Sequence, residues 1–167
     1  MNSNVKLKMT LNSIGFENKV AQELASDLNS LLANFQVYYQ NLRCIHWNIK
    51  GKRFFGLHVK FEELYNDANL KVDEIAERIL TLGETPIHTF EDYIKNTKVP
   101  VGKNISTDEK AVRLILDSLT ELLTIERGIL NKSEDASDEG TNSMMRGFIT
   151  QQEKAVWMMK AWLNETV

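Results

Sequence analysis

Two pairs of potential metal ligands lie along one segment of the sequence. His58 is followed by Glu62, and Asp73 by Glu77, each at a spacing of four residues. On an α-helix, residues four apart lie on the same face, so each pair can direct both side chains at one ion. A further imidazole, His46, precedes this segment. Imidazole and carboxylate groups without a cysteine among them suit a divalent first-row metal such as Fe(II) or Zn(II).

The segment that carries these ligands has the periodicity of a helix packed on a core. From about residue 55 to residue 82, apolar residues recur at spacings of three and four: Leu57, Phe61, Leu64, Ala68, Val72, Ile75, Ile79 and Leu82. That spacing is typical of an amphipathic helix. The ligand stripe lies one residue further on, a rotation of about 100°. It therefore borders the core face and does not point into it.

The distance along this helix decides how the two pairs can meet. Glu62 and Asp73 are eleven residues apart, which is about 16 Å at roughly 1.5 Å per residue. One straight helix cannot bring both to one ion. Two copies packed antiparallel about a twofold axis place His58 and Glu62 of one chain opposite Asp73 and Glu77 of the other. This arrangement predicts two identical sites per dimer, on the order of 22 Å apart.

A structural interpretation of the same residues stays open at this point. Charged stripes on helices are usually solvated faces, and His46, next to Trp47, could be a core histidine with a satisfied hydrogen bond. Tyr65, Ala76 and Leu80 on the same side of the helix make a fully solvated face harder to sustain.

Four long helical patterns and one long connection define the expected fold. We expect helices over about 18–49, 55–82, 106–131 and 141–164, with a short helix at 89–95. The connection of residues 83–105 contains both prolines and is too long for a hairpin, so we expect it to cross the length of the bundle. One long crossover between the second and third helices predicts an all-α, ferritin-like four-helix bundle.

Local signals indicate where these helices begin and end. Gly51 and Gly83 are expected to end the first two helices. Ser106 and Glu109 have the spacing of a capping box at the start of the third helix. The short polar tail is expected at residues 1–12 and a single domain at residues 13–167.

Composition narrows the class of protein further. The chain has 167 residues, a net charge of −3 and a single cysteine, Cys44. A mildly acidic chain argues against a surface devoted to nucleic acid, and one cysteine forms no internal disulfide and fits a reducing compartment. No apolar run reaches the roughly 18–20 residues that span a bilayer, and the amino terminus lacks the apolar stretch of a secretion signal. We therefore expect a soluble, cytoplasmic protein without a membrane partner.

The run from His46 to Arg78 closely resembles the signature of the Dps family, mini-ferritins named as DNA-binding proteins from starved cells. It reads HWNIKGKRFFGLHVKFEELYNDANLKVDEIAER. The matching pattern is His-Trp, Gly, Phe, Leu-His, an acidic residue four further on, and Asp-x-x-Ala-Glu-Arg. The resemblance implies five ferroxidase ligands, three from one subunit and two from its twofold mate: His46, His58 and Glu62, with Asp73 and Glu77. Glu62 stands where many family members have Asp.

The same resemblance implies an activity and an assembly. Fe(II) would be oxidised at the dimer interfaces, preferably by hydrogen peroxide with oxygen as the alternative, and ferric mineral would be stored in a hollow dodecamer. Twelve chains of 19.2 kDa make a shell of roughly 230 kDa. Zn(II) accepts the same ligands. Trp47 would flank the site, where such a residue is thought to intercept oxidising equivalents. The alternative for Trp47 is packing at the dimer interface.

Acidic residues before the fourth helix fall where family members place pores through which iron enters the shell: Glu134, Asp135, Asp138 and Glu139. A charged surface loop is the alternative interpretation of this stretch.

DNA binding in the family often uses a lysine-rich terminal extension. Here the amino-terminal tail offers Lys6 and Lys8, while the shell would carry a charge near −36, twelve times −3. We therefore expect weak or absent DNA binding at physiological salt. The alternative function is a nucleoid-associated DNA-binding protein in which iron oxidation is secondary.

Overall fold

Helices make up most of the part of the chain that the structure describes. The computed structural model describes residues 11–167, and its helices are α1 (Asn18–Asn48), α2 (Phe54–Thr81), α3 (Phe90–Asn96), α4 (Asp108–Asp135) and α5 (Glu139–Trp162). Within this range, β pairing is confined to one isolated bridge between Leu11 and Glu17. The expected all-α bundle, with a short helix inside the crossover, is confirmed.

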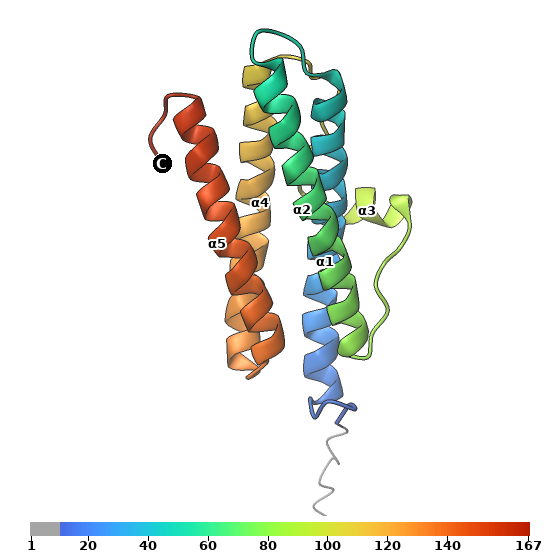
Figure 1. Cartoon of the computed structure of the whole chain (residues 1–167). Coiled ribbons are helices and arrows are strands. Elements are labelled where there is room, and N and C mark those ends of the chain that lie inside the picture. Colours follow the sequence, from blue (N-terminus) through green and yellow to red (C-terminus); the bar gives the residue numbers. More distant parts are fainter. Residues whose placement is uncertain (1–10) are drawn as a thin grey trace, which may run out of the picture.

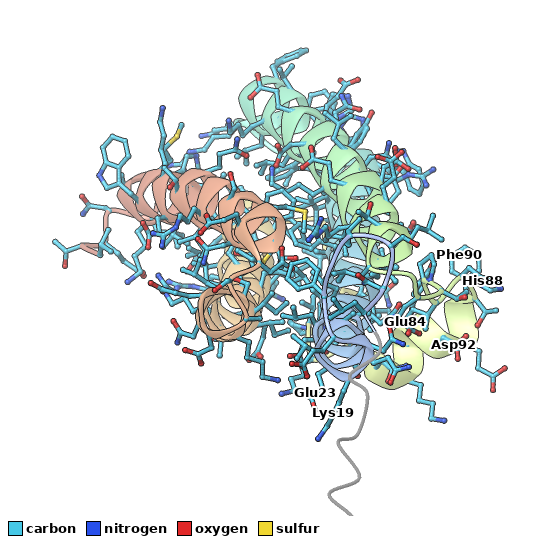
Figure 2. All side chains as sticks on the ribbon, turned by 90° about the horizontal axis from the view of Figure 1, so that it is seen from below. Lys19, Glu23, Glu84, His88, Phe90 and Asp92 are labelled. Carbon is cyan, nitrogen blue, oxygen red and sulfur yellow. The ribbon has the colours of Figure 1, made fainter. Side chains whose placement is uncertain are left out.

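The path of the chain explains why the crossover is long. The chain runs up α1 and down α2, returns along the bundle through α3, and then runs down α4 and up α5 (Figure 1). Seen along the bundle in Figure 2, α3 lies on the flank of the molecule, with Phe90 and Asp92 directed outward. None of the helices in residues 11–167 has the length and hydropathy that a bilayer crossing requires.

The core forms along the apolar stripe that the sequence predicts for α2. Leu57, Phe61, Ala68, Ile75, Ile79 and Leu82 are buried, whereas Leu64 and Val72 are half-buried. They pack against the buried face of α1, which includes Leu24, Leu28, Leu31, Phe35, Leu42 and Ile45. Because this stripe faces the core, the neighbouring ligand stripe of α2 lies at the edge of the packed face.

Two asparagines on the buried side of α1 fasten the crossover. Asn34 Oδ1 accepts a hydrogen bond from the backbone N–H of Val99 at 3.0 Å. Asn41 Nδ2 donates to the carbonyl of Pro100 at 2.7 Å, and its Oδ1 accepts from the N–H of Gly102 at 2.8 Å. These amides satisfy backbone groups of a segment that has no helix or sheet of its own. The sequence pattern alone does not reveal this function.

The predicted bounds are accurate for α1 and α2 and less so for the last two helices. Thr107 caps α4 without a side-chain hydrogen bond, so the capping box expected from Ser106 is wrong. The helix also continues to Asp135, past the expected end near residue 131. It continues because this turn is still packed: Ser133 is buried and receives a hydrogen bond from the Asn142 amide of α5.

Candidate metal centre

Two histidines from neighbouring helices form the centre of the candidate site. His46 lies in the last turn of α1 and His58 in the second turn of α2. The short connection of residues 49–53 places the two helix ends side by side. The rings stack with their centroids 3.8 Å apart and their planes 19° from parallel. His46 is 8% exposed, while His58 is half-buried.

The backbone of each histidine holds the ring of the other. His46 Nδ1 lies 2.8 Å from the carbonyl oxygen of His58, and His58 Nδ1 lies 2.9 Å from that of His46. A carbonyl oxygen only accepts, so each Nδ1 carries a hydrogen and donates it. In a neutral imidazole, Nε2 then keeps its lone pair. The reciprocal bonds therefore fix two rings and their tautomers, and leave two nitrogen donors for a metal.

Aromatic side chains enclose the histidine pair. Phe54 stacks on His58 with 4.9 Å between ring centroids, and Tyr65 meets His46 edge-on at 5.2 Å. The Tyr65 hydroxyl donates a hydrogen bond to Glu62 Oε1 at 3.2 Å. Desolvation of the hydroxyl, together with the Glu62 carboxylate and Tyr39, raises the pKa of Tyr65 above its usual value, so the hydroxyl keeps its proton. In the sequence, only the three-residue spacing between Glu62 and Tyr65 signals this bond.

The three carboxylates of the ligand stripe are exposed on α2. Glu62 lies one turn after His58, and Asp73 and Glu77 lie several turns further on. Because α2 is unbroken from Phe54 to Thr81, Asp73 and Glu77 stay remote from the histidine pair. No three His, Cys, Asp or Glu side chains of the described chain gather closely enough to hold a metal. A second chain as the source of the distant carboxylates stays a prediction.

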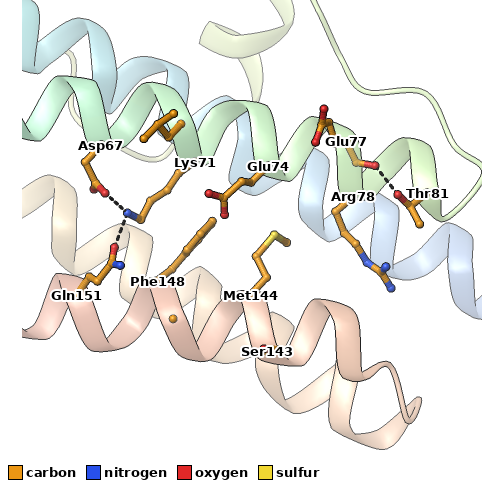
Figure 3. Close-up of a pocket in the computed structure, with 12 residues that line it drawn as sticks. Asp67, Lys71, Glu74, Glu77, Arg78, Thr81, Ser143, Met144, Phe148 and Gln151 are labelled. Carbon is orange, nitrogen blue, oxygen red and sulfur yellow. Dashed lines mark hydrogen bonds and ion pairs between the residues drawn. The ribbon is translucent and has the colours of Figure 1, made fainter.

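Glu77 also borders a groove between α2 and α5. The groove has a volume of about 620 Å³, and Asp67, Lys71 and Glu74 contribute to its lining (Figure 3). The Lys71 ammonium donates to Asp67 and to Gln151 of α5, so this cation joins the two helices that form the groove.

The remaining predicted residues fall outside this centre. Trp47 is 57% exposed beside His46, and the Arg43 guanidinium lies 4.6 Å from the centroid of its ring. Its redox role stays a prediction. The third histidine of the chain, His88, belongs to the exposed crossover on the α3 side (Figure 2). Lys6 and Lys8 lie outside the described residues.

The acidic residues before α5 have different environments. Asp135 and Glu139 are exposed, as is Glu134, and their role at a pore stays a prediction. Asp138 is 1% exposed, accepts hydrogen bonds from Thr141 and pairs with Arg78 of α2. Asp138 is thus engaged by groups of its own chain, and its role at a pore also stays a prediction.

Comparisons with known proteins agree with this architecture. The family described as ferritin-like domain matches residues 25–167. The crystal structure of the Dps protein from Vibrio cholerae O1, a member of a broad superfamily of ferritin-like diiron-carboxylate proteins, is similar, with a TM-score of 0.91 and 46% identity. The match covers 93% of this chain and 98% of that one.

Relatives of known sequence extend the comparison. The DNA protection during starvation protein of Porphyromonas gingivalis is 38% identical, over 95% of this chain and 100% of its own length. An uncharacterized protein of Haemophilus influenzae is 46% identical, over 92% and 96%. The four-helix bundle and these matches define a ferritin-like protein. Within that class, the chain belongs to the Dps family.

Proposed function

We propose that this protein is a ferroxidase and iron-storing mini-ferritin that protects the cell under oxidative stress. Fe(II) is its substrate. The observation that carries the proposal is the histidine pair, whose two Nε2 atoms are left free by the reciprocal backbone bonds, with the Glu62 carboxylate one turn away. Nitrogen and oxygen donors of this kind suit Fe(II), and Zn(II) competes for the same ligands.

Two chains are required to complete each site. When α2 of a second chain packs antiparallel on the first, Asp73 and Glu77 of that chain face His46, His58 and Glu62. The twofold axis generates two such sites per dimer. The added carboxylates offset the charge of the bound cations, which the neutral imidazoles cannot do. Twelve chains assemble into a hollow shell in which ferric mineral collects.

Hydrogen peroxide is the preferred oxidant, with oxygen as the alternative. Peroxide takes one electron from each of two Fe(II) ions and, with two protons, gives two Fe(III) and two water molecules. Because both electrons are delivered in one site, little hydroxyl radical is released. The protein contributes the donor geometry and open coordination positions, and the redox chemistry belongs to the iron.

Protection of DNA follows from this reaction without tight DNA binding. The oxidation consumes Fe(II) and peroxide, the two reactants that together damage DNA. We place the protein in the cytoplasm. With a net charge of −3 per chain, we expect weak or absent binding to the phosphate backbone at physiological salt.

Replacing His58 and Asp73 together by alanine tests the site assignment. The variant loses one ligand from each side of every proposed site, so peroxide-driven oxidation of anaerobically loaded Fe(II) should slow by at least about tenfold. Near-ultraviolet absorbance follows the oxidation, and gel filtration checks that the shell of roughly 230 kDa still assembles.

The matched control replaces a histidine and a carboxylate outside the site. His88 and Glu91 are both exposed on the crossover, and the variant with both changed to alanine should oxidise iron at the wild-type rate. Rapid oxidation by an assembled His58→Ala, Asp73→Ala shell would refute the ligand assignment.

A further inference from the structure

Tyr65 contacts candidate ligands from both helices of the site. Its hydroxyl donates to Glu62 Oε1 on its own helix, α2, at 3.2 Å. Its ring meets the His46 ring of α1 edge-on, with 5.2 Å between centroids and an interplanar angle of 83°. It also packs against the Tyr39 ring of α1, with 6.2 Å between centroids. Tyr65 is therefore held in place by α1 while its hydroxyl reaches a ligand of α2.

Glu62 needs such a contact more than the histidines do. The histidine rings are locked by backbone carbonyls, whereas the Glu62 side chain is exposed. A free glutamate side chain samples many rotamers, and fixing it to bind a metal costs conformational entropy. A hydrogen bond to one carboxylate oxygen reduces that cost. It also leaves Oε2 as the oxygen available to the metal.

We propose that Tyr65 is a positioning residue of the metal centre, which presets the Glu62 carboxylate for metal binding through its hydroxyl and the His46 ring through its edge. This inference rests on the proposed function, because it takes Glu62 and His46 to be ligands. Hydrogen-bond partners of metal ligands typically change metal affinity by about 10–100-fold when removed. The hydroxyl of Tyr65 should act in that range through Glu62.

Tyr65→Phe distinguishes the role of the hydroxyl from the role of the ring. The variant keeps the packing against His46 and Tyr39 and loses only the bond to Glu62. Titration of the assembled protein with Co²⁺, followed by its visible absorption, measures both the affinity and the coordination of a redox-stable ion. We expect about tenfold weaker Co²⁺ binding and a changed absorption spectrum. Thermal unfolding should be nearly unchanged.

Tyr93→Phe is the matched control. Tyr93 lies on α3, away from the site, and its hydroxyl also donates one hydrogen bond, to the carbonyl of Ile87 at 3.3 Å. Its loss should leave the affinity and the spectrum of Co²⁺ as in the wild type. A structural effect common to tyrosine hydroxyls would instead weaken binding in both variants.

A double-mutant cycle shows whether Tyr65 acts through Glu62. If it does, Tyr65→Phe has little further effect on Co²⁺ affinity once Glu62 is alanine. Wild-type affinity and spectrum in Tyr65→Phe would overturn the inference, and so would an equal loss in the Glu62→Ala background. The His58→Ala, Asp73→Ala shell tests the proposed function separately: if its Co²⁺ binding equals that of the wild type, the ligand assignment falls and the inference falls with it.

Discussion

At the scale of single residues, Glu126 of α4 is an acidic group in the centre of the bundle. It is fully buried, and the Gln152 amide of α5 donates to its Oε1. Among the described residues, Glu126 Oε2 and Gln152 Oε1 are buried without a hydrogen-bond donor. Burial raises the pKa of Glu126 to about 8, although Gln152, Lys71 and Arg127 each lower it. Glu126 is therefore protonated at neutral pH, and its carboxyl group is a potential hydrogen-bond donor instead of a buried charge.

The raised pKa makes stability depend on pH in a defined window. Between pH 4.5, the ordinary value, and about 8, the unfolded chain releases the Glu126 proton and the folded chain keeps it. The contribution of Glu126 to the free energy of unfolding is therefore fully present below pH 4.5 and decreases as the pH rises to about 8.

Glu126→Gln should remove this dependence, because glutamine stays neutral and can bond reciprocally to Gln152. We expect the free energy of unfolding to change little near pH 4.5. At pH 8 it should increase by at most about 5 kcal/mol, at about 1.4 kcal/mol for each unit by which the pKa is raised. Urea unfolding at both pH values measures the difference. Glu121→Gln, on a less buried part of the same helix, is the control. A loss of stability at pH 8 in Glu126→Gln would contradict a raised pKa of Glu126 in the fold.

The types and spacing of the site residues could be predicted from the sequence, but their contacts could not. The four-residue spacing of His58 and Glu62 follows from helix geometry alone. The stacking of His46 on His58 depends on the relative rotation of α1 and α2, which residues 49–53 and the core packing set. Nothing in the sequence pattern indicated that Glu126 is buried, because its burial depends on how α4 faces the other three long helices.

At the scale of helices, one polar cluster fastens α2 to the turn between α4 and α5. Asp138 is the N-cap of α5 and accepts from the backbone N–H and the hydroxyl of Thr141. Arg78 of α2 donates to both Asp138 and Thr141. Arg78 also lines the groove between α2 and α5 (Figure 3).

Asp138→Ala removes a helix cap and one partner of a buried ion pair. Loss of the cap costs about 0.5–2 kcal/mol, and an unpaired buried charge costs more. We expect a total loss of about 3 kcal/mol, seen as a lower urea midpoint with an unchanged slope. Asp135→Ala, at an exposed position, should stay within about 0.5 kcal/mol of the wild type. Equal stability of the two variants would contradict the structural role of Asp138.

The contribution of the Asp138 carboxylate to stability depends on pH in the opposite direction to that of Glu126. Burial alone would raise its pKa, but the bonds from Thr141 and Arg78 outweigh this, and the pKa of Asp138 falls below its usual 3.8. Its contribution is therefore present above pH 3.8 and lost as the pH falls through the lower folded value. This acid-induced loss should be absent in Asp138→Ala.

Hydrophobic periodicity was sufficient to predict the long helices, but not the tertiary contacts that hold the connections to them. The crossover is held by Asn34 and Asn41 of α1, polar residues on a face that periodicity assigns to the core. The end of α4 was predicted too early, because the acidic stretch after residue 131 resembles a loop. In the fold, Ser133 is packed against Asn142 of α5, and the helix continues.

At the scale of the whole molecule, a single chain leaves apolar side chains exposed on α2 and α3. Phe90 and Ile94 of α3 are 86% and 59% exposed, and Leu70 and Leu80 of α2 are 63% and 59% exposed. Figure 2 shows Phe90 directed away from the bundle. Exposed apolar residues on α2, the helix that carries four of the five proposed ligands, favour contact with another chain. A second chain packed on α2 would cover Leu70 and Leu80 and complete the metal centre in the same step.

Mixed shells test whether each site is shared between two chains. His58→Ala removes a ligand from one side of the site and Asp73→Ala from the other, so shells of either variant alone should oxidise Fe(II) slowly. When the two variants are co-expressed, half of the dimers pair unlike chains. In those dimers one site carries both substitutions and the other carries none. Random mixing should therefore restore rapid oxidation at about a quarter of all sites in the mixed shells.

Co-expression of either variant with the His88→Ala, Glu91→Ala control chain shows how that variant behaves when it is diluted by chains with intact ligands. Sites built within one chain would gain nothing from mixing, because every chain in the shell would still lack one of its ligands.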